Sequence, residues 1–317
     1  MAERSNVSII IPCFNASGTL RATIESVLAQ GIELEMVVID DGSTDDSLAI
    51  AQGFGTALRA ITGANQGVSS ARNRGIAETT CEWIIFLDAD DLLLPGTIAK
   101  RLEAAERSGA DVIVCDWVGD EHLRGGRSMD WTKVNADPEL AFATGIWAPP
   151  AALMYRRSVV DKIGGFRQEV LLGEDWCFLF AAAFHGAHFV HAAHTGMYYR
   201  VSPASLSRRD PAQKLRGGLA SARLIEDLWR SRGPLTGPQR KVCAHNYDLI
   251  ARALFWSGHP DYFEAVKRQR AQGERLSRHA RIARPLARTI GLRRAGQVLR
   301  LLGRYRSSLQ QGSVNQS

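Results

Sequence analysis

The sequence predicts an α/β fold: a Rossmann-like, mostly parallel sheet flanked by helices, with a C-terminal helical extension. Strand-length apolar runs alternate with segments of helical periodicity over about the first 115 residues. Such alternation is typical of parallel sheets with right-handed crossover helices. After residue 212 the periodicity is helical only, and Lys and Arg dominate the end of the chain. We therefore expect a sheet domain over 1–212, a helical extension over 213–266 and a basic tail over 267–317.

The composition is that of an ordinary soluble globular protein. Of 317 residues, 45% are hydrophobic and 23% are charged, which excludes whole-chain disorder, collagen and coiled coil. No stretch reaches the roughly 18–20 uncharged apolar residues that a membrane span needs, and the N-terminus lacks the apolar core of a signal peptide. The five cysteines are dispersed, with no CxxC pair. We expect reduced thiols and a cytoplasmic location, with neither disulfides nor a zinc site.

Four apolar runs in the first half predict buried strands, because continuous β-branched runs are typical of strands covered on both faces. Capping residues support the helices between them: Gly31 after the first, and Ser43 or Thr44 before the second. Pro95 opens the fourth helix, with Leu102 on its apolar face. The expected strands are 7–11, 36–39, 83–87 and 112–114, and the first and third helices cover 20–28 and 68–77.

The pattern weakens after Gly119, and residues 119–150 are expected to be rich in loops. Short strands and longer helices follow, the last of which could form a dimer face. The expected elements are strands at 153–156, 189–190 and 197–200, and helices at 175–185, 213–232 and 239–256.

The charge is unevenly distributed. Residues 267–306 hold thirteen Lys and Arg and one acid, Glu274, so the rest of the chain carries a net charge of −6 within a total of +6. Apolar residues between the arginines of this tail have helical spacing, which predicts an amphipathic basic helix. Three interpretations stay open: packing on the body, docking on an anionic membrane, or nucleic-acid binding. The last is disfavoured because few aromatic residues interleave with the arginines.

Polar clusters stand directly after three of the predicted strands. They are Pro12-Cys13-Phe14-Asn15, Asp40-Asp41 and Asp88-Ala89-Asp90-Asp91. Ligands of open α/β sheets bind beyond the carboxyl ends of the strands, so these groups converge if the strands are neighbours. Clustered carboxylates repel one another, and a divalent cation with oxygen ligands, Mg²⁺ or Mn²⁺, would compensate them. The alternative is that the acids only decorate helix N-termini.

These clusters also carry a family resemblance. VSIIIPCFNASGTLRATIESVLAQ, VVIDDGSTDDS, NQGVSSARNRG and WIIFLDADD resemble, in this order and spacing, the family 2 glycosyltransferases with the GT-A fold. The resemblance continues in MYRRSVVDKIGGFRQEVLLGEDWCFLFAAAFHG and YYRVSPASLS, and covers about residues 5–207. It does not cover the helical region or the basic tail.

The resemblance implies roles for individual residues. In the DxD motif Asp90 would contact the metal directly, and Asp88 would bind the ribose or a metal-bound water. For Arg72 the alternative is a charge pair on a helix surface. The residues implied in nucleotide binding are Pro12, Phe14, Asn15, Asp41, Arg72 and Asp88.

The ED motif implies the catalytic groups. Asp175 would be the general base that deprotonates the acceptor hydroxyl in a single inverting displacement, and Glu174 would bind sugar hydroxyls. Trp176 could present an apolar face to a sugar ring. Ser202 stands where many members have a histidine, which leaves the third protein ligand of the metal open. The residues implied in diphosphate or acceptor contacts are Arg200, Ser205, Ser207 and Trp176.

The sequence thus predicts a metal-dependent inverting glycosyltransferase with a nucleotide-sugar donor, UDP-linked. The resemblance implies a role in bacterial surface polysaccharide biosynthesis. The acceptor would be a glycan or a lipid-linked glycan at the inner face of the plasma membrane. The tail over 267–306 would contact this membrane face. A homodimer is possible, and no nucleic-acid partner is expected. One alternative is a non-catalytic protein that binds nucleotide-sugars. A nucleotidyltransferase is disfavoured because no Gly-rich basic loop follows the first strand.

Overall fold

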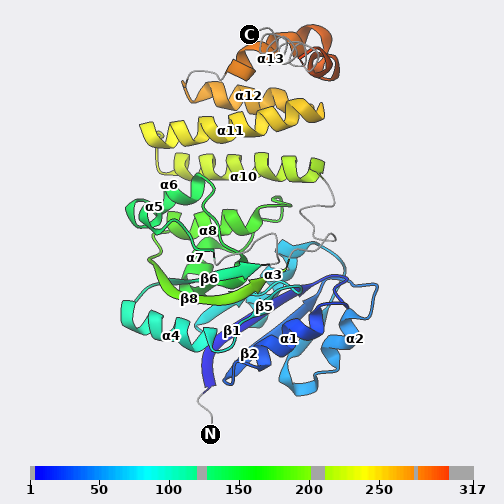
Figure 1. Ribbon diagram of the computed structural model, residues 1–317, viewed down its shortest axis with the longest axis vertical. Helices are drawn as coiled ribbons and strands as arrows, with labels where there is room; N and C mark the ends of the chain where they lie inside the picture. The colour runs from blue at the N-terminus through cyan, green and yellow to red at the C-terminus, as the bar shows by residue number, and fades with distance from the viewer. Residues whose placement is uncertain (1–3, 120–126, 201–210, 275–277, 300–317) are drawn as a thin grey trace, which may run out of the picture. The chain divides into compact units, whose positions relative to one another are not determined.

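The computed structural model describes residues 4–119, 127–200, 211–274 and 278–299 (Figure 1). The chain divides into two compact units, Met1–Arg209 and Asp210–Ser317.

An eight-stranded mixed sheet forms the centre of the first unit within the described residues. Its strands are β1 (Arg4–Cys13), β2 (Glu33–Asp40), β3 (Arg59–Thr62), β4 (Trp83–Phe86), β5 (Leu92–Leu93), β6 (Val112–Gly119), β7 (Leu153–Arg156) and β8 (Phe189–Tyr199). They are ordered β3-β2-β1-β4-β7-β6-β8-β5. The pairs β1–β2, β1–β4, β2–β3 and β6–β8 are parallel, whereas β7 is antiparallel to both of its neighbours.

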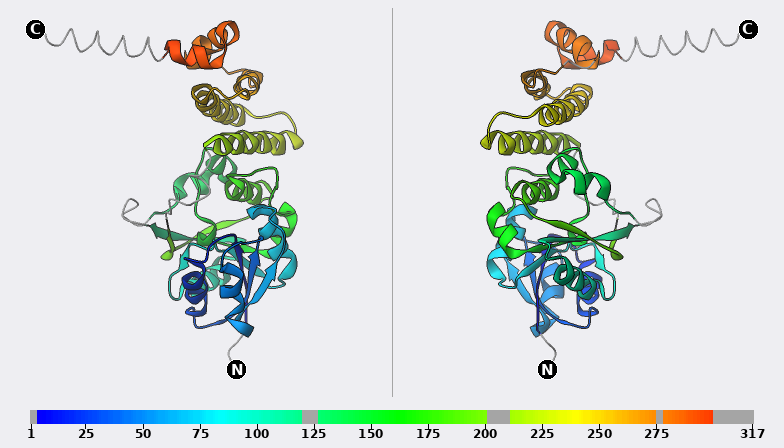
Figure 2. Two further views of the ribbon diagram at one scale, coloured as in Figure 1. Left: turned by 90° about the vertical axis from the view of Figure 1, so that its right-hand side faces the viewer. Right: turned by 90° about the vertical axis from the view of Figure 1, so that its left-hand side faces the viewer.

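Helices cover both faces of this sheet (Figure 2). They are α1 (Leu20–Leu28), α2 (Ser47–Gln52), α3 (Val68–Glu78), α4 (Thr97–Ser108), α5 (Trp131–Ala136), α6 (Pro138–Ala143), α7 (Arg157–Ile163) and α8 (Glu174–Phe184). The chain moves outward from β1 to β3 and then crosses back to β4 on the other side of β1. Because right-handed crossovers are the rule, this reversal places α3 on the face opposite to α1 and α2. The reversal makes the edge beyond β1 and β4 a topological switch point, where open α/β sheets bind ligands.

β1 lies in the core, as its apolar run predicts. Its residues Val7, Ile9, Ile10 and Ile11 are all fully buried. Helix α3 packs directly against this strand, because a Cβ at Gly75 would lie only 2.2 Å from Cγ2 of Ile10. This close approach fixes the helix that carries Arg72 over the strand.

The expected helix start at Ser43 or Thr44 is wrong. Helix α2 begins at Ser47, after Asp46. Ser43 and Thr44 instead bond Asn15 of the loop after β1, so they serve the loop contact and not the helix.

The expected loop-rich region contains two short helices within its described part. α5 follows Asp130 and α6 follows Asp137, and each aspartate side chain accepts a hydrogen bond from a backbone N–H of the first turn. The two short strands expected near 189 and 197 are one strand, β8, which stays paired with β6 through register shifts at Cys115–Trp117. In α4 it is Arg101 that is fully buried, whereas Leu102 is half-buried.

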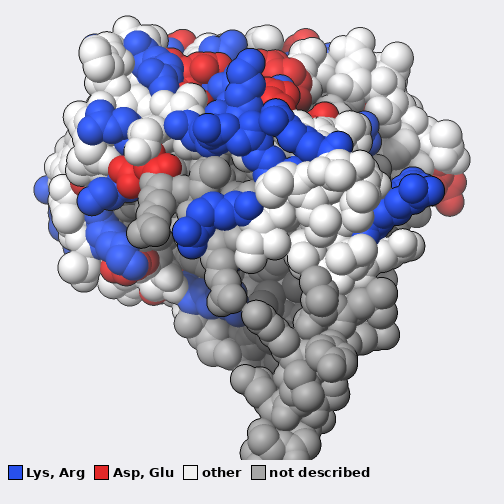
Figure 3. Space-filling view, turned by 90° about the horizontal axis from the view of Figure 1, so that it is seen from above, with Lys and Arg blue, Asp and Glu red and all other residues white. Residues whose placement is uncertain are grey.

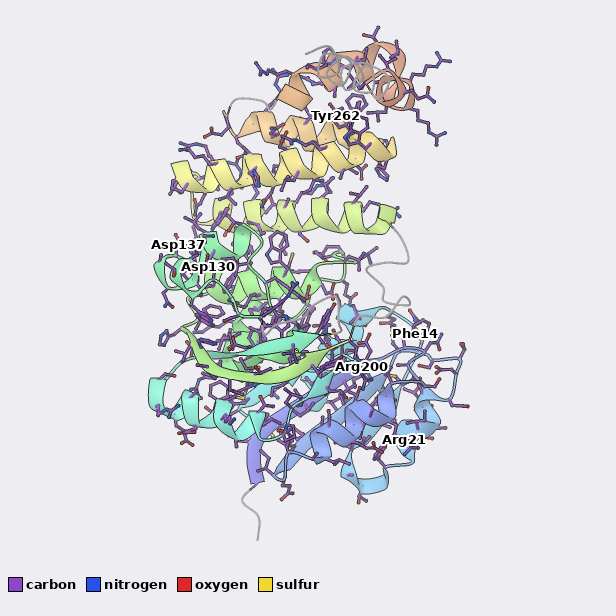
Figure 4. All side chains as sticks on the ribbon, in the orientation of Figure 1. Phe14, Arg21, Asp130, Asp137, Arg200 and Tyr262 are labelled. Carbon is purple, nitrogen blue, oxygen red and sulfur yellow. The ribbon has the colours of Figure 1, made fainter. Side chains whose placement is uncertain are left out.

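The second unit is helical. Its elements are α10 (Pro211–Ser231), α11 (Gly237–Ser257), α12 (Tyr262–Ala271) and α13 (Arg278–Ile290), and residues 292–299 are also helical. A capping box of Thr236 and Gln239 starts α11. Tyr247, Phe255 and Tyr262, the last labelled in Figure 4, are buried between these helices. Within the described residues, no helix is long and apolar enough to cross a bilayer.

Candidate active site

The polar clusters that follow β1, β2 and β4 lie at one edge of the sheet. β1 pairs with β2 on one side and with β4 on the other, both in parallel, so the carboxyl ends of all three strands meet there. The sequence predicts that these polar clusters converge if the three strands are neighbours. They are neighbours, so the predicted convergence is confirmed. Asp41 and Asp88 flank the end of β1 from its two neighbours.

The loop after β1 is tied to the loop after β2. Asn15, which has a left-handed φ of 51°, donates its backbone N–H to Oγ of Ser43 at 3.0 Å, and its Oδ1 accepts the Thr44 N–H at 2.8 Å. Asn is one of the few residues that tolerates this conformation. Pro12 is buried, whereas the side chain of Phe14 is 42% exposed on the loop (Figure 4). This loop can present an aromatic ring to a base.

Asp41 holds the loop that leads into α3. Its two carboxylate oxygens accept the N–H groups of Gln66 and Gly67, each at 2.8 Å. Gly42, with φ of 74°, allows the close approach, since a Cβ there would lie 2.9 Å from the backbone N of Asn65. Each Asp41 oxygen keeps a second lone pair for a base N–H.

Arg72 is buried at the centre of the site, so the alternative of a surface charge pair is wrong. Its guanidinium donates to Oδ1 of Asp88 at 2.7 Å and to Oε1 of Glu174 at 2.8 Å, and it lies 5.1 Å from the ring centre of Phe166. Burial lowers the pKa of Arg72, but the charges of Asp88 and Glu174 outweigh it and raise the pKa overall. One fixed cation thus joins the DxD and ED motifs.

The DxD segment, Asp88-Ala89-Asp90, has more negative charge than the neighbouring cations and hydrogen-bond donors neutralise. Burial and the charge of Asp88 raise the pKa of Asp90 to about 6. Asp91 is fully buried, and its Oδ1 accepts the backbone N–H of Arg200 at 2.9 Å. Burial and the charges of Asp88 and Asp90 raise the pKa of Asp91 well above its usual value. Asp91 thus holds the backbone at Arg200 next to the DxD segment.

Glu174 starts α8, after Gly173 in a left-handed conformation. The carboxylate is buried and its Oε1 accepts from Arg72. Burial and the neighbouring charge of Asp175 raise the pKa of Glu174 to about 7, against the opposing effect of Arg72. The structure thus gives Glu174 a contact with Arg72 that the sequence did not predict.

Asp175 is held by two donors. Its Oδ2 accepts the indole N–H of Trp147 at 2.7 Å, and its Oδ1 accepts the backbone N–H of Trp176 at 2.8 Å. Burial of the carboxyl raises its pKa, whereas the charge of Arg72 and the Trp147 N–H lower it. The indole N–H of Trp176 donates to the carbonyl of Phe142 at 2.6 Å. Asp175 thus has a fixed orientation and a pKa above the usual value of an aspartate.

Trp147 is a site residue that the sequence analysis missed. It lies in the segment without periodicity, and its ring packs edge-on to Trp117 and Tyr199. Burial and nearby carboxylates raise the pKa of Tyr199 to about 12. The only available signal was a tryptophan between Gly145 and Pro149, which does not indicate a contact 28 residues away.

The residues fit a divalent cation that takes most of its ligands from a substrate. In the part of the chain that the structure describes, no three His, Cys, Asp or Glu residues form a metal-binding group. Asp88 and Asp90 are the carboxyl side chains available there, and burial together with the charge of Asp88 raises the pKa of Asp90, a penalty that a bound cation would relieve. Mg²⁺ is commonly bound in this way, by one or two carboxylates and substrate phosphates. Ser202, Ser205 and Ser207 lie outside the described residues.

The model of glycosyl transferase family 2 matches residues 8–164. A PGL/p-HBAD biosynthesis glycosyltransferase of Mycobacterium bovis is 32% identical over 179 residues, which are 54% of this chain and 67% of the relative. The chain belongs to glycosyl transferase family 2. The succinoglycan biosynthesis protein ExoO of Rhizobium meliloti is 27% identical over 223 residues, 64% of this chain and 63% of ExoO. The chain spans less than two thirds of the length of the first curated relatives that it matches: 62%, 36% and 63%.

Solved structures share the fold of this family 2 member. TarS of S. aureus (residues 1–349), in complex with UDP-GlcNAc, has a TM-score of 0.65 at 18% identity and covers 93% of this chain and 91% of its own. A mannosyltransferase of Pyrobaculum calidifontis, in complex with GDP-Man and Mn²⁺, has a TM-score of 0.54 at 19% identity, with 93% and 84% covered. The α/β class expected from the sequence, with its GT-A sheet and C-terminal helices, is confirmed.

Proposed function

We propose that this protein is a metal-dependent inverting glycosyltransferase that moves a sugar from a UDP-sugar to a glycan or lipid-linked acceptor. One observation carries the proposal: Arg72 joins Asp88 and Glu174 next to Asp175, whose orientation and raised pKa suit a general base. Membership of family 2 and the name of ExoO support a role in surface polysaccharide biosynthesis.

The proposed roles follow from the contacts. Asp175 accepts the proton of the acceptor hydroxyl as that oxygen attacks the anomeric carbon from the side opposite the nucleotide, a step worth about 10²- to 10⁴-fold in rate. Arg72 holds Glu174 and Asp88 in place, so it positions the base and the donor site together. Phe14 and Asp41 receive the base of the nucleotide, with Pro12 and Asn15 shaping their loop.

Asp90, with Asp88, is the proposed holder of Mn²⁺ or Mg²⁺. When bound, the ion neutralises charge on the diphosphate leaving group. Arg200 is fixed through its backbone N–H by Asp91. Its side chain, together with Ser205 and Ser207, is proposed to contact the diphosphate or the acceptor. Trp176 is proposed to face a sugar ring.

A thermal-shift panel tests the donor assignment. UDP, GDP, dTDP, CDP and ADP are each added with and without Mn²⁺ to the full chain. A ligand at about 100 times its Kd stabilises a protein by about 2.7 kcal/mol. We expect a metal-dependent shift with UDP, because a TarS complex contains UDP-GlcNAc. A shift with GDP instead would point to a donor such as that of the mannosyltransferase complex and would overturn the UDP assignment.

Turnover separates the enzyme from the alternative of a non-catalytic binding protein. UDP release from UDP-sugars with glycan acceptors is measured on the wild type and on Asp175→Asn. Release that depends on Asp175 supports the transferase. Binding of UDP with no turnover on any acceptor would support the non-catalytic alternative.

We also propose that the chain associates with an anionic membrane through its basic tail, at the cytoplasmic face where a lipid-linked acceptor would be available. The support is the excess of Lys and Arg over 267–306. The full chain should sediment with vesicles of phosphatidylcholine and phosphatidylglycerol and not with phosphatidylcholine alone. Equal sedimentation with both kinds of vesicle would contradict the membrane association.

The homodimer also stays a prediction. Leu249 and Trp256 are exposed apolar residues on α11, the helix expected at a dimer face. Light scattering of the purified chain tests this prediction.

A further inference from the structure

A groove of about 530 Å³ lies in the second unit, lined from α12 and α13. Its basic lining residues have helical spacing: Lys267 and Arg270 on α12, Arg284 and Arg288 on α13. Residues three or four apart share one face of a helix, so each helix presents two cations to the groove. Seen from above the orientation of Figure 1, Lys and Arg side chains form a band on this face (Figure 3).

Within the described residues, none of these four cations forms an ion pair with a carboxylate. Glu264, the acid of the groove, is held instead by Arg223 and by Arg268 at 3.2 Å. Burial and repulsion from Arg288 and Arg270 lower the pKa of Arg284. Like charges gathered without a counter-ion favour an anionic ligand.

An apolar side chain accompanies the cations. Phe263 lines the groove and is 37% exposed. Exposed apolar side chains beside Lys and Arg are typical of surfaces that lie at the lipid headgroup region, where the cations meet phosphates and the apolar groups enter the acyl boundary. A nucleic-acid surface would interleave several aromatic rings with the cations.

We propose that this groove binds the phosphate headgroups of anionic lipids, with Lys267, Arg270, Arg284 and Arg288 as the phosphate contacts. The inference rests on the membrane association proposed above. It assigns the lipid contacts to four side chains, where the earlier proposal named the whole tail. It is independent of the donor site, so glycosyl transfer is not its readout.

The test measures partition of the full chain onto phosphatidylcholine vesicles with and without phosphatidylglycerol, at 0.1 M NaCl. The variants are R284Q/R288Q and, because Arg284 is half-buried, the exposed pair K267Q/R270Q. The matched control is K100Q/K241Q, which removes two exposed positive charges that do not line the groove. A cation near an anionic surface contributes about 1 kcal/mol, so each groove pair should weaken partition about 30-fold, the equivalent of about 2 kcal/mol. The control pair should change it less than threefold.

Each outcome decides a different point. No binding of the wild type to anionic vesicles contradicts both the membrane association and the groove. If R284Q/R288Q and K267Q/R270Q bind anionic vesicles as well as the wild type does, the groove is not the lipid site, although the membrane association stands. The same conclusion follows if the control K100Q/K241Q weakens binding as much as they do. The lipid assignment is also wrong if the wild type binds an oligonucleotide or inorganic phosphate but not vesicles, and the groove substitutions abolish that binding. The thermal shift with UDP should be the same in all variants, which separates failure here from failure of the donor site.

Discussion

Two buried glutamates, one in each unit, have opposite electrostatic environments. Glu226 of α10 is 4% exposed, and Glu174 of α8 is 9% exposed. Burial alone raises the pKa of both. The pKa of Glu226 is nevertheless lowered, because its carboxylate accepts hydrogen bonds from Tyr247, Arg230, Arg268 and Gln272. Glu174 shares the single cation Arg72 with Asp88 and adjoins Asp175, so its pKa rises to about 7.

The difference shows that burial does not decide what a carboxylate does; the number of donors does. Glu226 is saturated with donors and ties three helices together, so its charge contributes to stability. The carboxylates around Arg72 have too few donors for their number, an arrangement typical of sites that bind cations or move protons. The following predictions test this contrast, beginning with the largest expected effect.

Asp175→Asn should reduce the rate of sugar transfer about 10²- to 10⁴-fold, because the amide cannot take the acceptor proton. The measurement is UDP release with a transferable acceptor, beside the UDP thermal shift, which should not change. The control is Glu226→Gln, which removes the buried carboxylate that is saturated with hydrogen-bond donors. This variant should transfer sugar at the wild-type rate but have a lower melting temperature. Full transfer by Asp175→Asn would show that another group is the base.

Arg72→Met should lower the free energy of unfolding by about 3–5 kcal/mol, the usual cost of leaving buried carboxylates without their cation. The corresponding change in the second unit, Arg268→Met, should cost clearly less, because Glu226 keeps three other donors. Urea unfolding of both variants gives the comparison. Equal losses would mean that the donors of Glu226 do not compensate for one another.

The sequence predicted this contrast only in part. Strands β1, β2 and β4 follow from continuous apolar runs, and each is followed by a polar cluster. The convergence of Asp41 and Asp88 could therefore be predicted on the condition that these parallel strands are neighbours, which they are. The Arg72–Glu174 pair spans 102 residues, so no local pattern reports it. Trp147 is hidden for the same reason, since tertiary placement and not periodicity brings it to Asp175. In the second unit, helical spacing predicted α10 and α11 but not which acid would be buried between them.

The pH dependence of stability should have opposite signs for the two glutamates. Because the folded pKa of Glu174 is about 7, the native state keeps a proton that the unfolded chain releases from about pH 4.5 upward. Its contribution to the free energy of unfolding therefore falls as pH rises from about 4.5 to 7, and Glu174→Gln should remove this decline. The folded pKa of Glu226 is lowered, so its stabilisation is present above pH 4.5 and is lost as pH falls through the folded pKa. Urea midpoints of both Gln variants against wild type, from about pH 3 to 8, measure the two slopes, and slopes of the same sign would contradict the contrast.

Trp147→Phe tests one donor of the catalytic carboxylate and should have the smallest effect. Phenylalanine retains an aromatic ring to pack against Trp117 and Tyr199 but loses the N–H to Oδ2 of Asp175. Since that N–H lowers the pKa of Asp175, its loss should move the acid limb of the kcat/KM profile to higher pH. The apparent pKa on this limb belongs to the coupled Glu174–Asp175 pair.

On the acid limb of the profile the rate of Trp147→Phe should fall about tenfold, in line with the roughly 1.5–3 kcal/mol of a hydrogen bond to a charged group. The rate should recover at higher pH, where the base is again ionised, and KM for the donor should not change. Trp131→Phe is the control, because its indole N–H donates to Ser128 and not to a site carboxylate. A fall that is equal at every pH would show that Trp147 only packs against the site and does not tune the base.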